Sequence, residues 1–172
     1  AASDVYKRQG ALNDSDTLEI RKELIQNDKI EAIVVLPREL FITTDISVTL
    51  WILNQNKKGG KYHGRNLRNR EHEILFMDLR QWTENAVKGE SKKKVRLDTE
   101  QIEKAADIYH TWQCEEIDGA AYEIPELYRS VCINEIESKG WALTPSKYIE
   151  FIDHDLDIDY EKEMARIQSE MK

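Results

Sequence analysis

Six lysine and arginine residues lie between positions 57 and 70 with no acidic residue among them, in a chain whose net charge is −8. The segment reads KKGGKYHGRNLRNR, and its glycines and asparagines are typical of a loop. Each phosphate that such cations neutralise releases a counterion and strengthens binding. An ordinary solvated loop has the same composition, so both interpretations stay open. The phosphate-contact hypothesis involves Lys57, Lys58, Lys61, Arg65, Arg68 and Arg70.

A second candidate is FITTD, residues 41–45, which interrupts two apolar, β-like runs. Phe41 offers an aromatic face, Thr43 and Thr44 offer hydroxyl groups, and Ile46 offers an apolar wall. At the ends of buried strands these groups could form the lip of a binding site. They could also form a plain connection, with Phe41 in the core and the threonines bonded to the backbone. The two interpretations have equal support.

No other pattern predicts catalysis or metal binding. Gly59 and Gly60 are isolated and do not form a glycine-rich phosphate loop. The four histidines have no ligand spacing with Cys114 and Cys132, which we expect to be free thiols in a reducing cytosol. We therefore assign no catalytic residue and no metal ligand.

Composition limits the class of protein. The 172 residues are 40% hydrophobic and 34% charged, as in a globular protein, and no apolar run approaches the length of a membrane span. The first residues are polar and do not form a signal peptide. We expect a cytoplasmic protein that does not bind membranes.

Apolar periodicity predicts the elements that position these residues. Residues 16–27 form a helix that opens on a capping box of Asp16 and Glu19. The Ile- and Val-rich run 30–36 is typical of a strand buried on both faces, and Pro37 ends it. Two further strands are predicted at residues 47–53 and 73–78.

The later sequence is predicted to be mostly helical. Asp98 and Gln101 can cap a helix, and a shorter helix at residues 133–139 ends at Gly140, a left-handed C-cap residue. Residues 141–151 are predicted to be extended. The apolar face of the first helix comprises Ile102, Ala105, Ala106, Tyr109 and Trp112, and a seam in a last helix comprises Tyr160, Met164, Ile167 and Met171.

This order of elements predicts the terminal part of a doubly wound α/β sheet, because three strands are too few for a self-sufficient sheet. DVYKRQ at positions 4–9 resembles the in-frame translation of a transposon end used in sequencing libraries. We therefore expect residues 1–9 to be a library scar that replaces upstream sequence. The predicted units after it are residues 10–82, 83–159 and a truncated helix at 160–172.

The longest block, EIRKELIQNDKIEAIVVLPRELFITTDISVTLWILNQNK, strongly resembles the modification (M) subunit of type I restriction–modification systems, an N6-adenine DNA methyltransferase. The resemblance continues in ILFMDLR, LDTEQIEKAADIYHTWQ and SVCINEIESKGWALTPSKYI, in the family's order and near its spacing. The segment 57–71 is longer and more basic than the family's. The resemblance covers nearly everything after Gly10.

The resemblance implies that residues 10–82 end a Rossmann-like, S-adenosylmethionine-dependent methyltransferase sheet, and that residues 83–159 form a mostly helical C-terminal extension. It also implies a complex with DNA, a specificity subunit, a second modification subunit and a restriction subunit. The family's glycine-rich cofactor loop and its Asn/Asp-Pro-Pro-Tyr/Phe tetrapeptide do not occur in this sequence. We therefore expect S-adenosylmethionine to be bound mainly by an upstream part and assign no cofactor-binding residue here.

On this resemblance, Phe41, Thr43, Thr44 and Ile46 would help to form the pocket for the flipped target adenine, because an extruded base needs an aromatic or apolar face and a few hydrogen-bonding groups. The alternative is a non-catalytic DNA-binding or complex-assembly module. An Asn-Pro-Pro-Phe-like tetrapeptide in the upstream reading frame would favour the enzyme, and its absence would favour the module.

Overall fold

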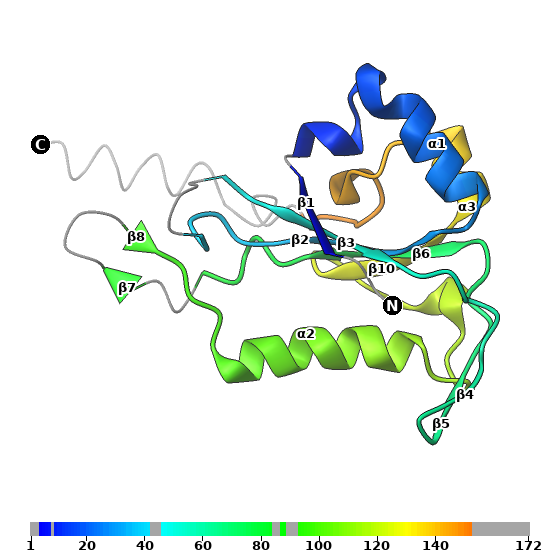
Figure 1. Ribbon diagram of the computed structural model, residues 1–172. Helices are drawn as coiled ribbons and strands as arrows, with labels where there is room; N and C mark the ends of the chain where they lie inside the picture. The colour runs from blue at the N-terminus through cyan, green and yellow to red at the C-terminus, as the bar shows by residue number, and fades with distance from the viewer. Residues whose placement is uncertain (1–3, 8, 42–45, 84–86, 89–92, 153–172) are drawn as a thin grey trace, which may run out of the picture.

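A computed structural model describes residues 4–7, 9–41, 46–83, 87–88 and 93–152 (Figure 1). The strands are β1 (Asp4–Lys7), β2 (Ile30–Val35), β3 (Thr49–Leu53), β4 (Gly60–Tyr62), β5 (Arg65–Leu67), β6 (Glu73–Asp78), β7 (Val87–Lys88), β8 (Lys93–Lys94), β9 (Glu123–Ile124) and β10 (Tyr128–Cys132). The helices are α1 (Leu18–Gln26), α2 (Thr99–Trp112) and α3 (Ile133–Ser138). Short 3₁₀ turns occupy Gln9–Leu12, Ser15–Thr17, Gly119–Ala121 and Pro145–Lys147.

Six strands form one mixed sheet in the order β1-β3-β2-β6-β10-β9. Strands β2 and β6 pair in parallel, and the other neighbours in this sheet pair in antiparallel fashion. Helices α1 and α3 lie on one face of the sheet and α2 lies on the other (Figure 1). The predicted α/β class is confirmed.

Strand β2 supplies the centre of the core, since all six of its residues are buried. Successive side chains of a strand point to opposite faces of its sheet. Ile33 accordingly packs in the cluster that contains Ile25 of α1, whereas Val34 packs in the cluster that contains Ile108 and Trp112 of α2. The continuous apolar run predicted this two-sided burial.

The described residues after residue 82 are not mostly helical, unlike the sequence prediction. Strand β10 pairs along its length with β6, from Tyr128 opposite Met77 to Cys132 opposite Glu73. It was missed because Arg129 and Ser130 break its apolar pattern. The predicted boundary at residue 82 therefore falls between two strands that are neighbours in one sheet.

Two capping boxes were predicted at helix N-termini. The one at α1 is wrong, and the one at α2 is confirmed. Asp16 lies inside a short 3₁₀ turn, and Thr17 takes the N-cap position of α1 without a side-chain hydrogen bond to a backbone N–H of the first turn. The hydroxyl of Thr17 instead accepts a hydrogen bond of 2.6 Å from Arg21. The capping box of α2 is present, with the Asp98 carboxylate accepting from the backbone N–H of Gln101 at 2.8 Å.

Other local predictions hold in part. Gly140 has a φ of 71° after α3, as predicted for a left-handed C-cap residue. Ile102 is 55% exposed, so the buried face of α2 is instead centred on Ile108 and Trp112. The segment predicted to be extended contains the 3₁₀ turn Pro145–Lys147. The predicted terminal helix at residues 160–172 lies outside the described residues.

Candidate functional site

The carboxyl ends of β2 and β6 meet at one edge of the sheet. Val35 pairs with Asp78, and the backbone N–H of Leu79 donates to the Val35 carbonyl at 2.9 Å. The chain leaves β2 at this edge and returns to it at β3, where the Leu36 N–H donates to the Val48 carbonyl at 2.9 Å. In open α/β sheets, ligands bind beyond the carboxyl ends of parallel strands.

The connection between β2 and β3 contains the predicted target-base residues. Phe41 is half-buried, and Ile46 has 45% of its surface exposed. Thr43 and Thr44 lie outside the described residues. Phe41 and Ile46 therefore belong to the connection that leaves the carboxyl edge of the sheet after β2 and re-enters it at β3, and the roles of all four residues stay predictions.

An ion pair that the sequence analysis missed also lies at this edge. The buried Asp78 carboxylate accepts from Arg80, with 2.5 Å between Oδ2 and Nη2. This hydrogen bond raises the pKa of Arg80. The Arg80 side chain is 40% exposed, so it presents a fixed positive charge at the edge. An acid at a strand end followed by an arginine two residues later was the available signal.

The basic segment forms a hairpin of β4 and β5 instead of an irregular loop. His63 and Gly64 at its turn have φ values of 46° and 80°, and two positive φ angles are the requirement of a tight type I′ turn. Lys58, Lys61 and Arg65 are exposed, and Arg65 Nη2 donates to the His110 carbonyl at 2.9 Å.

The other three cations of this segment are buried in ion pairs, where protein carboxylates engage them. Lys57 Nζ lies 2.6 Å from Asp28 Oδ1, and Arg68 Nη2 lies 2.7 Å from Glu73 Oε2. Burial lowers the pKa of Lys57, although Asp28 opposes this effect. In this conformation Lys57, Arg68 and Arg70 hold the hairpin against the sheet, so only the three exposed cations can meet a phosphate at the surface.

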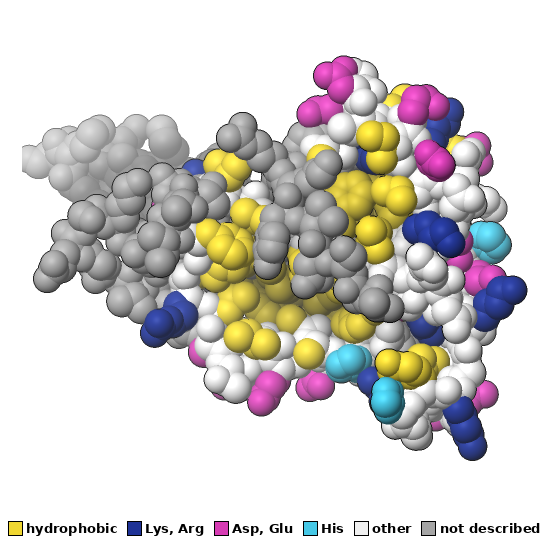
Figure 2. Space-filling model, viewed as in Figure 1, with side chains coloured by type: hydrophobic (Ala, Val, Ile, Leu, Met, Phe, Trp, Pro, Cys, Tyr) yellow, Lys and Arg dark blue, Asp and Glu magenta, His cyan; other side chains and the backbone are white. Residues whose placement is uncertain are grey.

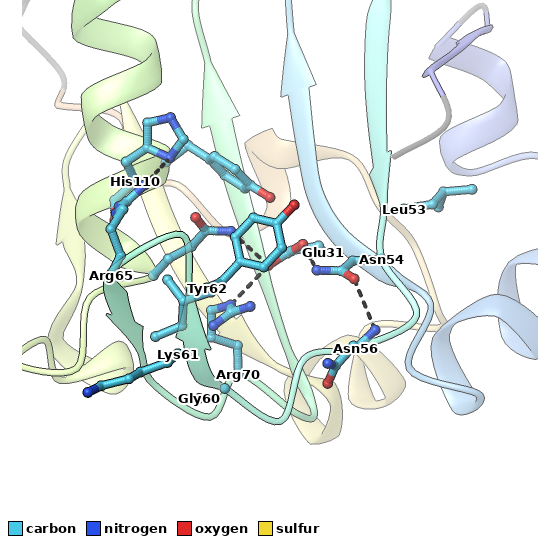
Figure 3. A pocket seen from close by; sticks show the side chains of 14 residues that line it. Glu31, Leu53, Asn54, Asn56, Gly60, Lys61, Tyr62, Arg65, Arg70 and His110 are labelled. Carbon is cyan, nitrogen blue, oxygen red and sulfur yellow. Dashed lines mark hydrogen bonds and ion pairs between the residues drawn. The ribbon is translucent and has the colours of Figure 1, made fainter. Parts of the chain in front are cut away.

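Arg70 belongs to a polar cluster around Glu31, at the amino end of β2 (Figure 3). Both side chains are 1% exposed, and Arg70 Nε lies 2.9 Å from Glu31 Oε1. Asn54 donates to the same carboxylate at 2.6 Å, and Gln113 donates to it at 3.2 Å. Burial, together with the nearby Glu31 carboxylate, raises the pKa of Tyr109.

Glu31 was missed because it lies inside an apolar run. A single acid in a strand predicted to be buried on both faces requires hydrogen-bonding partners, and this was the usable signal. The cluster forms the floor of a cavity of about 490 Å³. The cavity is lined by Glu31, Leu53, Asn54, Asn56, Gly59, Gly60, Lys61, Tyr62, Arg65, Leu67, Arg70, Tyr109, His110 and Gln113.

Comparison with known proteins gives the family. The sequence profile described as N-6 DNA methylase matches residues 5–156. The chain belongs to the N-6 DNA methylase family. The methylase subunit of the type I restriction enzyme HindI from Haemophilus influenzae is 37% identical over 134 residues, which are 76% of this chain and 26% of that protein. The MjaVII methylase subunit from Methanocaldococcus jannaschii is 32% identical over 169 residues, 94% of this chain and 26% of that protein.

This N-6 DNA methylase chain thus spans about a quarter of the length of the curated relatives it matches. Its fold is similar to that of the type I restriction–modification methyltransferase subunit from Streptococcus thermophilus, with a TM-score of 0.64 at 19% identity, covering 88% of this chain and 27% of that one. The EcoKI M protein gives a TM-score of 0.55 at 12% identity, and the match covers 98% of this chain and 38% of that one.

Two negative observations concern the described part of this N-6 DNA methylase chain. Within it, no helix is both long enough and apolar enough to span a membrane. Among the same residues, no group of three or more histidine, cysteine, aspartate or glutamate side chains is placed to hold a metal ion.

Proposed function

We propose that this chain is one part of a site-specific DNA adenine-N6 methyltransferase subunit of a type I restriction–modification system. In such an enzyme a methyl group passes from S-adenosylmethionine to the adenine amino group. The observation that carries the proposal is the similarity of three quarters or more of the chain to type I methylase subunits, of whose length the matched segment covers only 26%.

The residues of this chain do not fit a complete methyl-transfer site. Its strand β2 is followed by Pro37 instead of a glycine-rich turn, and Pro37, Pro125 and Pro145 are too far apart to form a paired-proline tetrapeptide. We therefore assign no step of methyl transfer to this chain and expect an upstream part to bind the cofactor.

The role proposed for this part is to form one wall of the target-base pocket. The position of Phe41 and Ile46 beyond the carboxyl end of β2 supports it, since this is the edge at which open α/β sheets bind ligands. An extruded base stacks on aromatic or apolar side chains and forms hydrogen bonds with polar ones. Phe41 would supply the stacking face, Ile46 the apolar wall, and Thr43 and Thr44 the hydroxyl groups.

A second proposed role is contact with the DNA backbone through the exposed cations of the hairpin, Lys58, Lys61 and Arg65. Phosphate contacts position DNA without reading its sequence. On the same similarity we propose that the complete complex contains a specificity subunit, a second modification subunit and a restriction subunit. One structural relative comes from a study of complex assembly in a type I system.

Two binding measurements test these assignments. Calorimetry should detect no S-adenosylmethionine binding by the 172-residue chain, whereas the chain joined to its upstream coding sequence should bind the cofactor and methylate adenine. Micromolar binding of S-adenosylmethionine by the 172-residue chain would overturn the proposal that an upstream part binds the cofactor. An extended protein that binds DNA but neither binds the cofactor nor methylates would favour the alternative, a non-catalytic DNA-binding or assembly module, which the basic hairpin also fits.

For the hairpin, replacing Lys58, Lys61 and Arg65 together with glutamine should weaken DNA binding by the extended protein and reduce its salt dependence by roughly three units of log-log slope. The matched control replaces three exposed cations outside the hairpin, Arg96, Lys104 and Lys147, with glutamine. Equal slopes for the two triple variants would remove the hairpin from the interface.

A further inference from the structure

The cavity above the Glu31–Arg70 pair lies at the opposite end of the sheet from the proposed target-base wall. Glu31 is the second residue of β2, Asn54 directly follows the antiparallel β3, and Arg70 precedes β6, so all three lie near the amino ends of the parallel strands. At about 490 Å³ the cavity falls in the size range of small-molecule sites. The proposed function does not use it.

The charges of the cavity favour an anion. Lys61, Arg65 and Arg70 line it, against the single acid Glu31. Glu31 is already occupied by hydrogen bonds from Arg70, Asn54 and Gln113. An incoming anion would therefore meet a net excess of positive charge.

Arg70 lies on the floor of the cavity. It directs Nε to Glu31 and Nη1 to the Arg68 carbonyl, at 2.9 and 2.7 Å. Its side chain is 1% exposed and lines the cavity. Phosphate oxygens suit a guanidinium group well, so Arg70 adds to the attraction of the cavity for an anion.

The mouth of the cavity supplies an aromatic face. Tyr62 of the hairpin is 65% exposed and lies in front of the Glu31–Arg70 pair (Figure 3). Lys61 precedes it, and Arg65 stands across the turn with its guanidinium held by His110 at 3.1 Å. An exposed aromatic ring between cations is the combination that binds nucleotides through stacking and phosphate contact. Asn56 at the same mouth adds an exposed amide that can bind a base edge.

We propose that this cavity is a second nucleotide site, which binds a nucleoside monophosphate with its base on Tyr62 and its phosphate near Arg70 and Lys61. It is separate from the target-base wall, because the two lie at opposite ends of β2. The proposal does not rest on the methyltransferase assignment, since free nucleotides can test it in the 172-residue chain.

Isothermal titration of the full 172-residue chain with deoxyadenosine monophosphate tests the site, with inorganic phosphate and deoxyadenosine as separate probes. The nucleotide should bind at least about tenfold more tightly than either part alone. Tyr62→Ala should weaken nucleotide binding roughly tenfold, within the range that stacking of one base contributes. Lys61→Gln should weaken binding of the nucleotide and of phosphate, but not of deoxyadenosine.

Lys104→Gln is the matched control, because Lys104 is an exposed cation of α2 that does not line the cavity. It should bind the nucleotide as the unaltered chain does. The three substituted residues are exposed, and circular dichroism would verify that each variant is folded. Absence of nucleotide binding, equal affinity for phosphate and nucleotide, or an unchanged affinity of Tyr62→Ala would each overturn the proposal and leave the methyltransferase assignment untouched.

Discussion

The two ends of the parallel pair β2–β6 are built differently. At the amino end, three cations of the basic segment are buried against carboxylates and join the hairpin to β2 and β6. At the carboxyl end, Asp78 and Arg80 form an ion pair whose arginine is 40% exposed, and Phe41 and Ile46 are only partly covered. The amino end therefore holds buried ion pairs, whereas the carboxyl end keeps partly exposed side chains.

The same contrast is visible on the molecular surface. Figure 2 shows a hollowed area of hydrophobic side chains over the middle of the molecule, above α2, while basic side chains project near the β4–β5 hairpin. Leu50 and Ile52 of β3 are among the partly buried hydrophobic residues on the α2 side of the sheet.

The largest expected effect comes from breaking the buried pair at the amino end. Arg70→Met should lower the free energy of unfolding by about 3–5 kcal/mol, because it leaves the Glu31 carboxylate buried without its partner. Urea denaturation measures the change, and Lys58→Met is the exposed control. Adding Glu31→Leu to Arg70→Met should recover most of the loss. A double variant no more stable than the single variant would show that the cost does not come from the unpaired carboxylate.

A smaller effect is expected for Ser130→Ala in β10. The Ser130 hydroxyl accepts from Trp112 Nε1 at 3.0 Å and donates to Glu73 at 3.3 Å, so its loss strands a buried donor. The free energy of unfolding should fall by about 2 kcal/mol. Ser138→Ala, at an exposed position of α3, should change it by less than about 0.5 kcal/mol. Equal effects of Ser130→Ala and Ser138→Ala would contradict the contribution of the hydrogen bonds that join Trp112, Ser130 and Glu73.

The Arg80–Asp78 ion pair at the carboxyl end should contribute less to the free energy of unfolding than the Arg70–Glu31 pair at the amino end. Arg80→Ala should cost about 1 kcal/mol, because the arginine is partly solvated and Asp78 keeps a hydrogen bond of 3.1 Å from the backbone N–H of residue 80. The comparison uses the same urea assay as Arg70→Met. A loss as large as that of Arg70→Met would mean that the two ends are equally rigid.

The smallest effect is a pH dependence at the amino end. Burial raises the pKa of Tyr109, so above pH ~10 the unfolded chain releases this proton while the folded chain retains it. Stability should therefore fall as the pH rises through this range, by roughly 0.4 kcal/mol from Tyr109 at pH 10 itself. Denaturation at pH 8 and pH 10 should show a weaker pH dependence for Tyr109→Phe. An identical pH dependence in Tyr109→Phe and in the unaltered chain would contradict the raised pKa of Tyr109.

Local patterns predicted what depends on neighbouring residues, such as strand β6 at Glu73–Asp78 and the capping box of α2. They did not predict the burial of Lys57 and Arg70, because the carboxylates that engage these cations lie 29 and 39 positions away. In the sequence alone, a run of cations is typical of a solvated surface, because the acids that pair with these cations are distant along the chain. Likewise, the polar residues of β10 do not alternate as a strand pattern requires, because the partner of Ser130, Trp112, lies on a different element.

The most direct test of the proposed target-base wall is single-turnover methyl transfer by the chain joined to its upstream coding sequence and assembled with the proposed specificity subunit. Phe41→Ala should lower the rate constant of methyl transfer at least about tenfold, with the free energy of unfolding little changed. Phe151→Ala is the matched control, since Phe151 is 41% exposed elsewhere. Only Phe41→Ala should lower the rate constant, and equal rate constants for the two variants would contradict the proposed role of Phe41.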